Sequence, residues 1–120
     1  MSESSVSFVE VCVYEVKPDK TKDFERLIER VADHHRQFPG TRDVRYMKRT
    51  HRPGDFASAR RGEPSIRLRK AKSTTYVLYW ELDNEFAHGK ATKSGLERFF
   101  TEFRRCLMAA PKIILGTRIE

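Results

Sequence analysis

The chain has 120 residues, of which 38% are hydrophobic and 11% aromatic, so it suits one globular domain and is not a disordered chain. Its apolar runs are too short to span a bilayer, and its first residues lack the basic and apolar segments of a secretion signal. The net charge of +7 comes mainly from residues 42–72, which contain eleven Lys or Arg residues and only three acidic residues. We therefore expect a cytoplasmic protein with one strongly basic segment.

The first predicted elements are a strand at residues 6–16 and a helix that ends near Phe38. Within the strand, valine occupies positions 9, 11 and 13 and alternates with larger or polar residues, a period of two that is typical of strands. The helix carries an apolar stripe at helical spacing, and Pro39-Gly40 ends it. The stripe consists of Phe24, Leu27, Ile28, Val31 and Phe38.

Alternation predicts a second strand at about 41–50 and a third at about 74–82. Between them lies a basic loop at about 51–72, in which Pro and Gly mark turns and no core-sized apolar face is present. A loop of this length is usually functional or mobile.

After the third strand, Asp83-Asn84 predicts a short helical turn that Gly89 ends. Ser94 and Glu97 have the spacing of a capping box, which predicts a new helix with a Phe-rich buried face up to Pro111. A last strand is expected at 113–119.

The element order β-α-β-β-α-β predicts an α+β, ferredoxin-like single domain over residues 1–120, with a four-stranded antiparallel sheet and two long helices on one face. We expect the strand-one valines to lie under the helices. The opposite face would then expose Phe8, Tyr14, Tyr76, Leu78 and Trp80. Burying one such side chain is worth about 1.5–3 kcal/mol, so we predict that a second copy covers this face in a homodimer.

One stretch resembles a known family: Tyr76-Val-Leu-Tyr-Trp80-Glu, then Phe86-Ala-His88, then Ser94 and a Phe-rich helix. With Lys17-Pro18-Asp19-Lys20 after a valine-rich strand, it looks like the antibiotic-biosynthesis-monooxygenase-like group of dimeric α/β barrels. The resemblance implies a cofactor-independent monooxygenase that acts on a small aromatic or quinol-type substrate. Its pocket would lie between sheet and helices or between subunits.

The resemblance places Trp80 at the tryptophan that closes the third strand in many members, and His88 near the histidine of the following helix. We take Glu10 and His88 as candidate catalytic bases, since a carboxylate in an apolar pocket can accept a proton. Aromatic candidates for substrate binding are Tyr14, Tyr46, Tyr76 and Trp80. Two simpler interpretations stay open: Trp80 and the tyrosines are interface core, and Glu10 forms an interchain ion pair with Arg45, Arg49 or Arg118.

The basic segment allows three interpretations. Arg60 and Arg61, with Arg67, Arg69, Lys70 and Lys72, would hold an anionic substrate at the barrel mouth. Contact with nucleic-acid phosphates is less favoured, because Phe56 is the only aromatic residue of the loop at 51–72. A solvated loop is the third interpretation.

The remaining chemistry-bearing residues indicate no metal. Cys12 and Cys106 form no CxxC pair, so we expect two core thiols. His34 and His35 are neighbours in sequence and point apart on a helix, which favours a solvated helix end. We predict no structural metal and no cofactor. A non-catalytic barrel that binds a small ligand, or serves as a stress or assembly module, is the alternative function.

Overall fold

The computed structural model describes residues 6–65 and 73–120. Predictions that concern Arg67, Arg69, Lys70 and Lys72 lie outside the described residues. Within the described ranges, no helix combines the length and apolar character that crossing a membrane requires.

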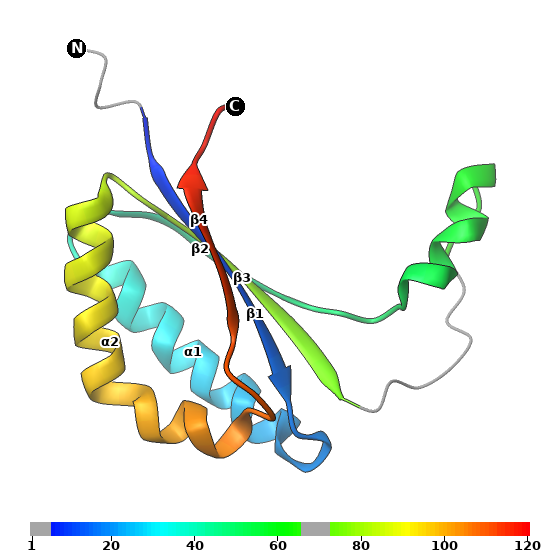
Figure 1. The fold of residues 1–120 in the computed structure, drawn as a ribbon, viewed down its shortest axis with the longest axis horizontal. Helices are drawn as coiled ribbons and strands as arrows, with labels where there is room; N and C mark the ends of the chain where they lie inside the picture. The colour runs from blue at the N-terminus through cyan, green and yellow to red at the C-terminus, as the bar shows by residue number, and fades with distance from the viewer. Residues whose placement is uncertain (1–5, 66–72) are drawn as a thin grey trace.

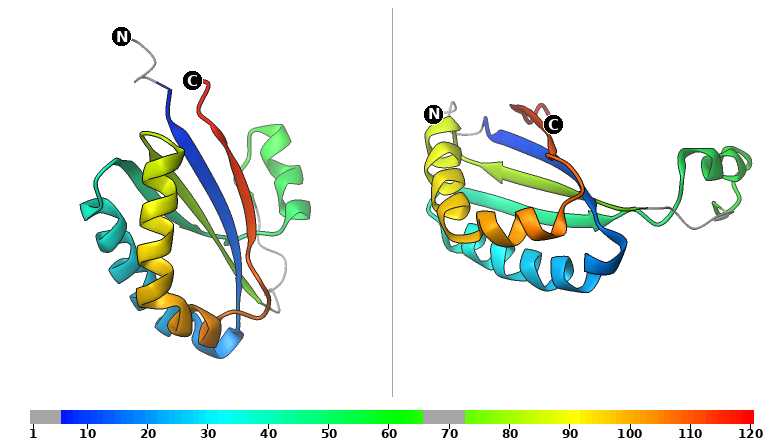
Figure 2. Two further views of the ribbon diagram at one scale, coloured as in Figure 1. Left: turned by 60° about the vertical axis from the view of Figure 1, so that its left-hand side comes forward. Right: turned by 60° about the horizontal axis from the view of Figure 1, so that its bottom comes forward.

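The predicted fold class is confirmed. The sheet has the strand order β2-β3-β1-β4 and is antiparallel throughout. Both long helices cover one of its faces (Figures 1 and 2). The elements in chain order are β1 (Phe8–Val16), η2 (Pro18–Lys20), α1 (Thr21–Gln37), β2 (Thr41–Lys48), η3 (Pro53–Arg61), β3 (Thr74–Leu82), α2 (Glu85–Cys106) and β4 (Lys112–Thr117).

The prediction of which strand face meets the helices is wrong. The face against the helices, called here the inner face, carries aromatic and other large residues of β1 and β3 rather than Val9, Val11 and Val13. Phe24 of α1 explains the choice, because its ring packs on Tyr76 at 4.8 Å and on Tyr14 at 5.5 Å between centroids. The inner face comprises Phe8, Glu10, Cys12, Tyr14 and Val16 of β1 and Tyr76, Leu78, Trp80 and Leu82 of β3.

The two helical segments predicted after β3 are one continuous helix. Asn84 caps α2 as expected, since its side-chain oxygen accepts a hydrogen bond from the Ala87 N–H at 2.9 Å. Gly89 does not end the helix. Ser94 lies within it rather than at a cap, and its hydroxyl instead meets Nε2 of His34 at 3.0 Å.

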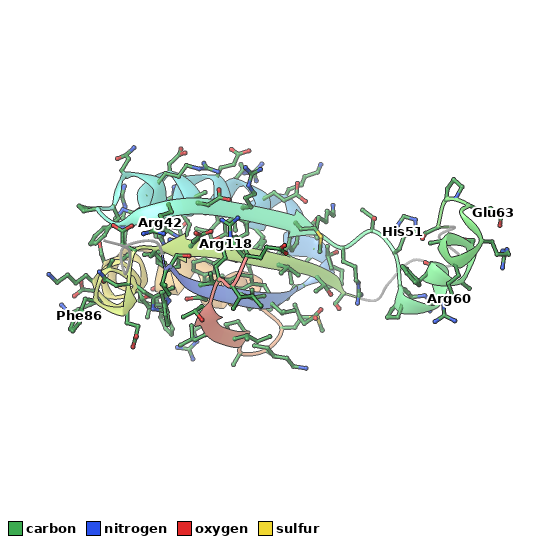
Figure 3. The ribbon with its side chains drawn as sticks, turned by 90° about the horizontal axis from the view of Figure 1, so that it is seen from above. Arg42, His51, Arg60, Glu63, Phe86 and Arg118 are labelled. Atoms are coloured by element: carbon green, nitrogen blue, oxygen red, sulfur yellow. The ribbon has the colours of Figure 1, made fainter. Side chains whose placement is uncertain are left out.

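The basic segment between β2 and β3 forms a projecting arm, defined here as residues 49–65. It lies away from both long helices (Figures 1 and 3). Its own contacts order it: the Arg52 N–H donates to Asp55 at 3.0 Å, and the Ser58 hydroxyl donates to the Pro64 carbonyl at 2.8 Å. What sequence alone treats as a loop therefore contains the 3-10 helix η3.

Candidate functional site

A cavity of about 550 Å³ lies between the inner face of the sheet and the helices. Its walls are largely apolar and come from α2 and the segment that follows, including Phe100, Phe103, Leu107 and Met108. The sheet contributes Glu10, Cys12, Tyr14, Leu78 and Trp80. The space thus corresponds to the first predicted location, between sheet and helices.

Glu10 and His88, the two candidate bases, are brought together. Glu10 Oε1 lies 2.6 Å from His88 Nε2, and the two side chains are only 9% and 12% exposed. Glu10 reaches the cavity from β1, whereas His88 comes from the first turns of α2 and also contacts the Phe8 ring at 5.0 Å. The pair is an internal one, because Glu10 meets a histidine rather than one of the arginines considered from the sequence.

Trp80 stands beside this pair. It is opposite Glu10 in the β1–β3 register, and its ring centroid is 5.2 Å from that of His88. The indole is 2% exposed, and within the described structure its Nε1–H has no hydrogen-bond partner. Trp80 is therefore part of the domain's own core and of the cavity wall, and the interpretation of it as interface core is wrong, because it lies on the inner face beneath the helices.

His35 is the site residue that sequence reasoning missed. The prediction of a solvated helix end is wrong for it, since it is 6% exposed and lines the cavity. Its ring stacks on Trp80 with 3.9 Å between centroids and 3° between planes. The signal was present: His35 follows Val31 by four positions and precedes Phe38 by three, so it continues the apolar stripe of α1.

The candidate tyrosines divide between two places. Tyr14 lines the cavity, whereas Tyr46 and Tyr76 line a smaller depression on the α1–β2 side. There the Tyr76 hydroxyl donates to Glu25 at 2.5 Å, which with Lys48 lowers the pKa of that carboxyl. Tyr46 and Tyr76 are thus separated from the cavity, contrary to the expectation of one shared pocket.

Burial keeps the Tyr14 hydroxyl and the Cys12 thiol of the cavity wall protonated at neutral pH. It raises the pKa of Tyr14 well above its ordinary value and that of the Cys12 thiol to about 11. Both cysteines are buried and free. The carboxylate in the cavity wall is that of Glu10, which is hydrogen-bonded to His88.

Arg60 and Arg61 are not brought to the cavity. The Arg60 guanidinium lies 6.0 Å from the Phe56 ring centroid, and Arg61 pairs with Glu63 at 3.0 Å, both on the projecting arm (Figure 3). The cation that lines the cavity is Arg104 of α2. Among residues 6–65 and 73–120, no group of three or more His, Cys, Asp or Glu side chains is arranged to hold a metal ion.

The sequence matches no protein-family model and no curated protein. Solved structures do share its fold. A Nitrosomonas europaea protein assigned as an antibiotic biosynthesis monooxygenase has a TM-score of 0.70 at 12% identity, over 94% of this chain and 90% of that one. A conserved protein from Methanosarcina mazei has a TM-score of 0.69 at 15% identity, over 95% and 94% of the two chains.

A third similar structure is SnoaB, a cofactor-independent oxygenase from Streptomyces nogalater solved as a point mutant. It has a TM-score of 0.65 at 16% identity and covers 95% of this chain and 94% of its own. The chain therefore has the ferredoxin-like fold of the antibiotic-biosynthesis-monooxygenase-like proteins. At these identities the likeness concerns the fold.

Proposed function

We propose that the protein is a cofactor-independent monooxygenase that oxidises a small aromatic or quinol-type substrate in the cavity. The observation that carries the proposal is Glu10, which lines an apolar space of about 550 Å³ and is paired with the largely buried His88 behind it. A base beside apolar walls is what removal of a proton from a phenol or enol requires.

In the proposed reaction, Glu10 removes a proton from the substrate, and the hydrogen bond to His88 supports the change of charge. The substrate anion gives one electron to O₂, and the two radicals combine to form a carbon-bound hydroperoxide. Return of the proton and loss of water leave a carbonyl. One oxygen atom ends on the substrate and the other in water, together with two substrate hydrogens, so no external reductant enters.

Two features support this proposal. The cavity walls contain flat aromatic side chains that suit a ring, namely Trp80, Phe100 and Phe103. The similar folds include SnoaB, which is a cofactor-independent oxygenase.

Oxygen consumption with a panel of hydroquinones and anthrones tests the proposal. We expect Glu10→Gln to lower kcat/KM at least about 100-fold, the lower range for loss of a general base. Glu15→Gln is the matched control, because Glu15 lies on the same strand but bonds Ser73 and Thr75 away from the cavity. Absence of turnover above the uncatalysed rate, or equal rates in both variants, would refute the proposal.

A ligand-binding role without turnover is the second candidate, because the same apolar cavity suits it. Saturable binding of the panel compounds to the wild-type protein, with no oxygen uptake, would favour that role.

A further inference from the structure

His35 is held between two layers of the fold. On one side its ring lies parallel to Trp80 of β3, and on the other it meets Gly95 of α2. A Cβ atom added at Gly95 would lie 3.3 Å from His35 Nε2, so the absence of a side chain there makes room for the imidazole. A buried helix glycine weakens the helix, and this contact gives it a structural reason.

The His35 imidazole is neutral at physiological pH. Burial, followed by the neighbouring His34 and His88, lowers its pKa to about 4. Glu10 bonds His88 and lies opposite Trp80 in the β1–β3 register. A neutral imidazole offers one N–H donor and one acceptor nitrogen.

Two ring nitrogens at this point have no partner within the described part of the chain, Nδ1 of His35 and Nε1 of Trp80. Both are buried, and both residues line the cavity. Buried polar groups in proteins are usually hydrogen-bonded, so two orphans on stacked rings point to a ligand atom that completes them.

We propose that His35 and Trp80 together bind one oxygen atom of the aromatic ligand. Because the indole Nε1–H only donates, that oxygen must be an acceptor: a carbonyl oxygen, or the phenolate or enolate oxygen that forms when Glu10 takes the proton. The inference rests on the proposed function for its aromatic ligand class, and it adds His35 as the residue that selects and orients the oxygenated end.

A matched pair of probes tests this site without any turnover. α-Tetralone and tetralin have the same fused rings and differ by one carbonyl oxygen. We expect α-tetralone to bind about tenfold more tightly, the value of a hydrogen bond to a buried group. Since Trp80 is the only tryptophan, the ¹⁵N-labelled protein has one indole resonance, and we expect its N–H proton to move downfield with α-tetralone but not with tetralin.

Substitutions assign the preference to His35. His35→Phe keeps a flat ring and His35→Leu removes it, and we expect both to reduce the preference to about threefold or less, as one of two partners is lost. His34→Phe is the control, because His34 bonds Ser94 and does not line the cavity. Equal affinity for the two probes, failure of both to bind, an unmoved indole resonance or an unchanged preference in both His35 variants would overturn the proposal.

The two proposals fail separately. Absence of oxygen uptake with an intact α-tetralone preference would refute the monooxygenase and leave the His35–Trp80 site in place. Glu10-dependent oxygen uptake without a preference for α-tetralone would refute the His35–Trp80 site and leave the monooxygenase in place.

Discussion

At the scale of single residues, His35 couples the stability of the fold to pH. Its pKa is about 4 in the folded protein and 6.5 in an unperturbed histidine, because burial disfavours the charged ring. Between pH 6.5 and about 4, His35 is protonated in the unfolded chain and neutral in the folded protein. The free energy of unfolding therefore falls as the pH falls from 6.5 towards 4 and becomes level with respect to this group below 4.

We expect this residue to cost about 2 kcal/mol of unfolding free energy between pH 7 and pH 5. Urea unfolding of wild type and His35→Phe at both pH values measures it. All other ionisable groups are present in both proteins, so the difference between the two pH slopes isolates His35. Parallel slopes would show that His35 is not buried as described.

Single residues also show how far the sequence predicts the site. Glu10, His88 and Trp80 were identified because each is a chemistry-bearing type at a fixed place on a predicted element. The contact of Glu10 with His88 was not, since it depends on how β1 and α2 approach one another. The place of His35 in the apolar stripe of α1 indicated its burial, but its contact with Gly95 was not predictable, because Gly95 is distant in sequence and carries no side chain to signal it.

At the scale of elements, α2 contains two glycines that serve different purposes. Gly89 is exposed, and an added Cβ would meet nothing within 4 Å. Gly95 is buried against the His35 ring. The Trp80 ring stacked on His35 blocks movement of that ring away from Gly95. The same substitution in the same helix therefore separates helix propensity from packing.

We expect Gly89→Ala to stabilise the protein by about 1 kcal/mol, the propensity difference in a helix. Gly95→Ala gains the same helix propensity, but the added methyl group crowds the His35 ring. We therefore expect a net destabilisation of about 1 kcal/mol. Chemical unfolding of the two variants measures the difference. If both substitutions stabilise the protein equally, the absence of a side chain at Gly95 is not needed to make room for the His35 ring.

Sequence periodicity predicts the element order. It does not predict which face of β1 the helices cover, or that α2 is one continuous helix. Alternation along β1 divides the strand into two faces and does not say which one the helices cover. Here the aromatic contacts of Phe24 with Tyr14 and Tyr76 decide it. Gly89 and Ser94 indicated a break in α2, yet the continuous helix is what carries Phe99 into the core and Gly95 to His35.

At the scale of the whole molecule, the corrected faces change which surface a partner would cover. The face away from the helices, called here the outer face, is open (Figure 2). Register places on it Val9, Val11, Val13, Met47, Val77, Tyr79 and Ile114. All four strands contribute apolar residues to it, beside charged ones such as Arg45, Glu81 and Lys112, and Met47 and Ile114 are 58% and 64% exposed. An open apolar surface of this kind usually marks an interface.

We therefore still expect a homodimer, formed through these valines rather than through Trp80. Light scattering after size exclusion should give twice the chain mass of 14.1 kDa. Ile114→Glu or Met47→Glu should give the single-chain mass, because each places a charge in the interface at a position the isolated chain already exposes. Phe86→Glu is the control, since Phe86 is 82% exposed at the start of α2, away from this face (Figure 3). A monomeric wild type, or dimers that survive both charged variants, would contradict this assignment.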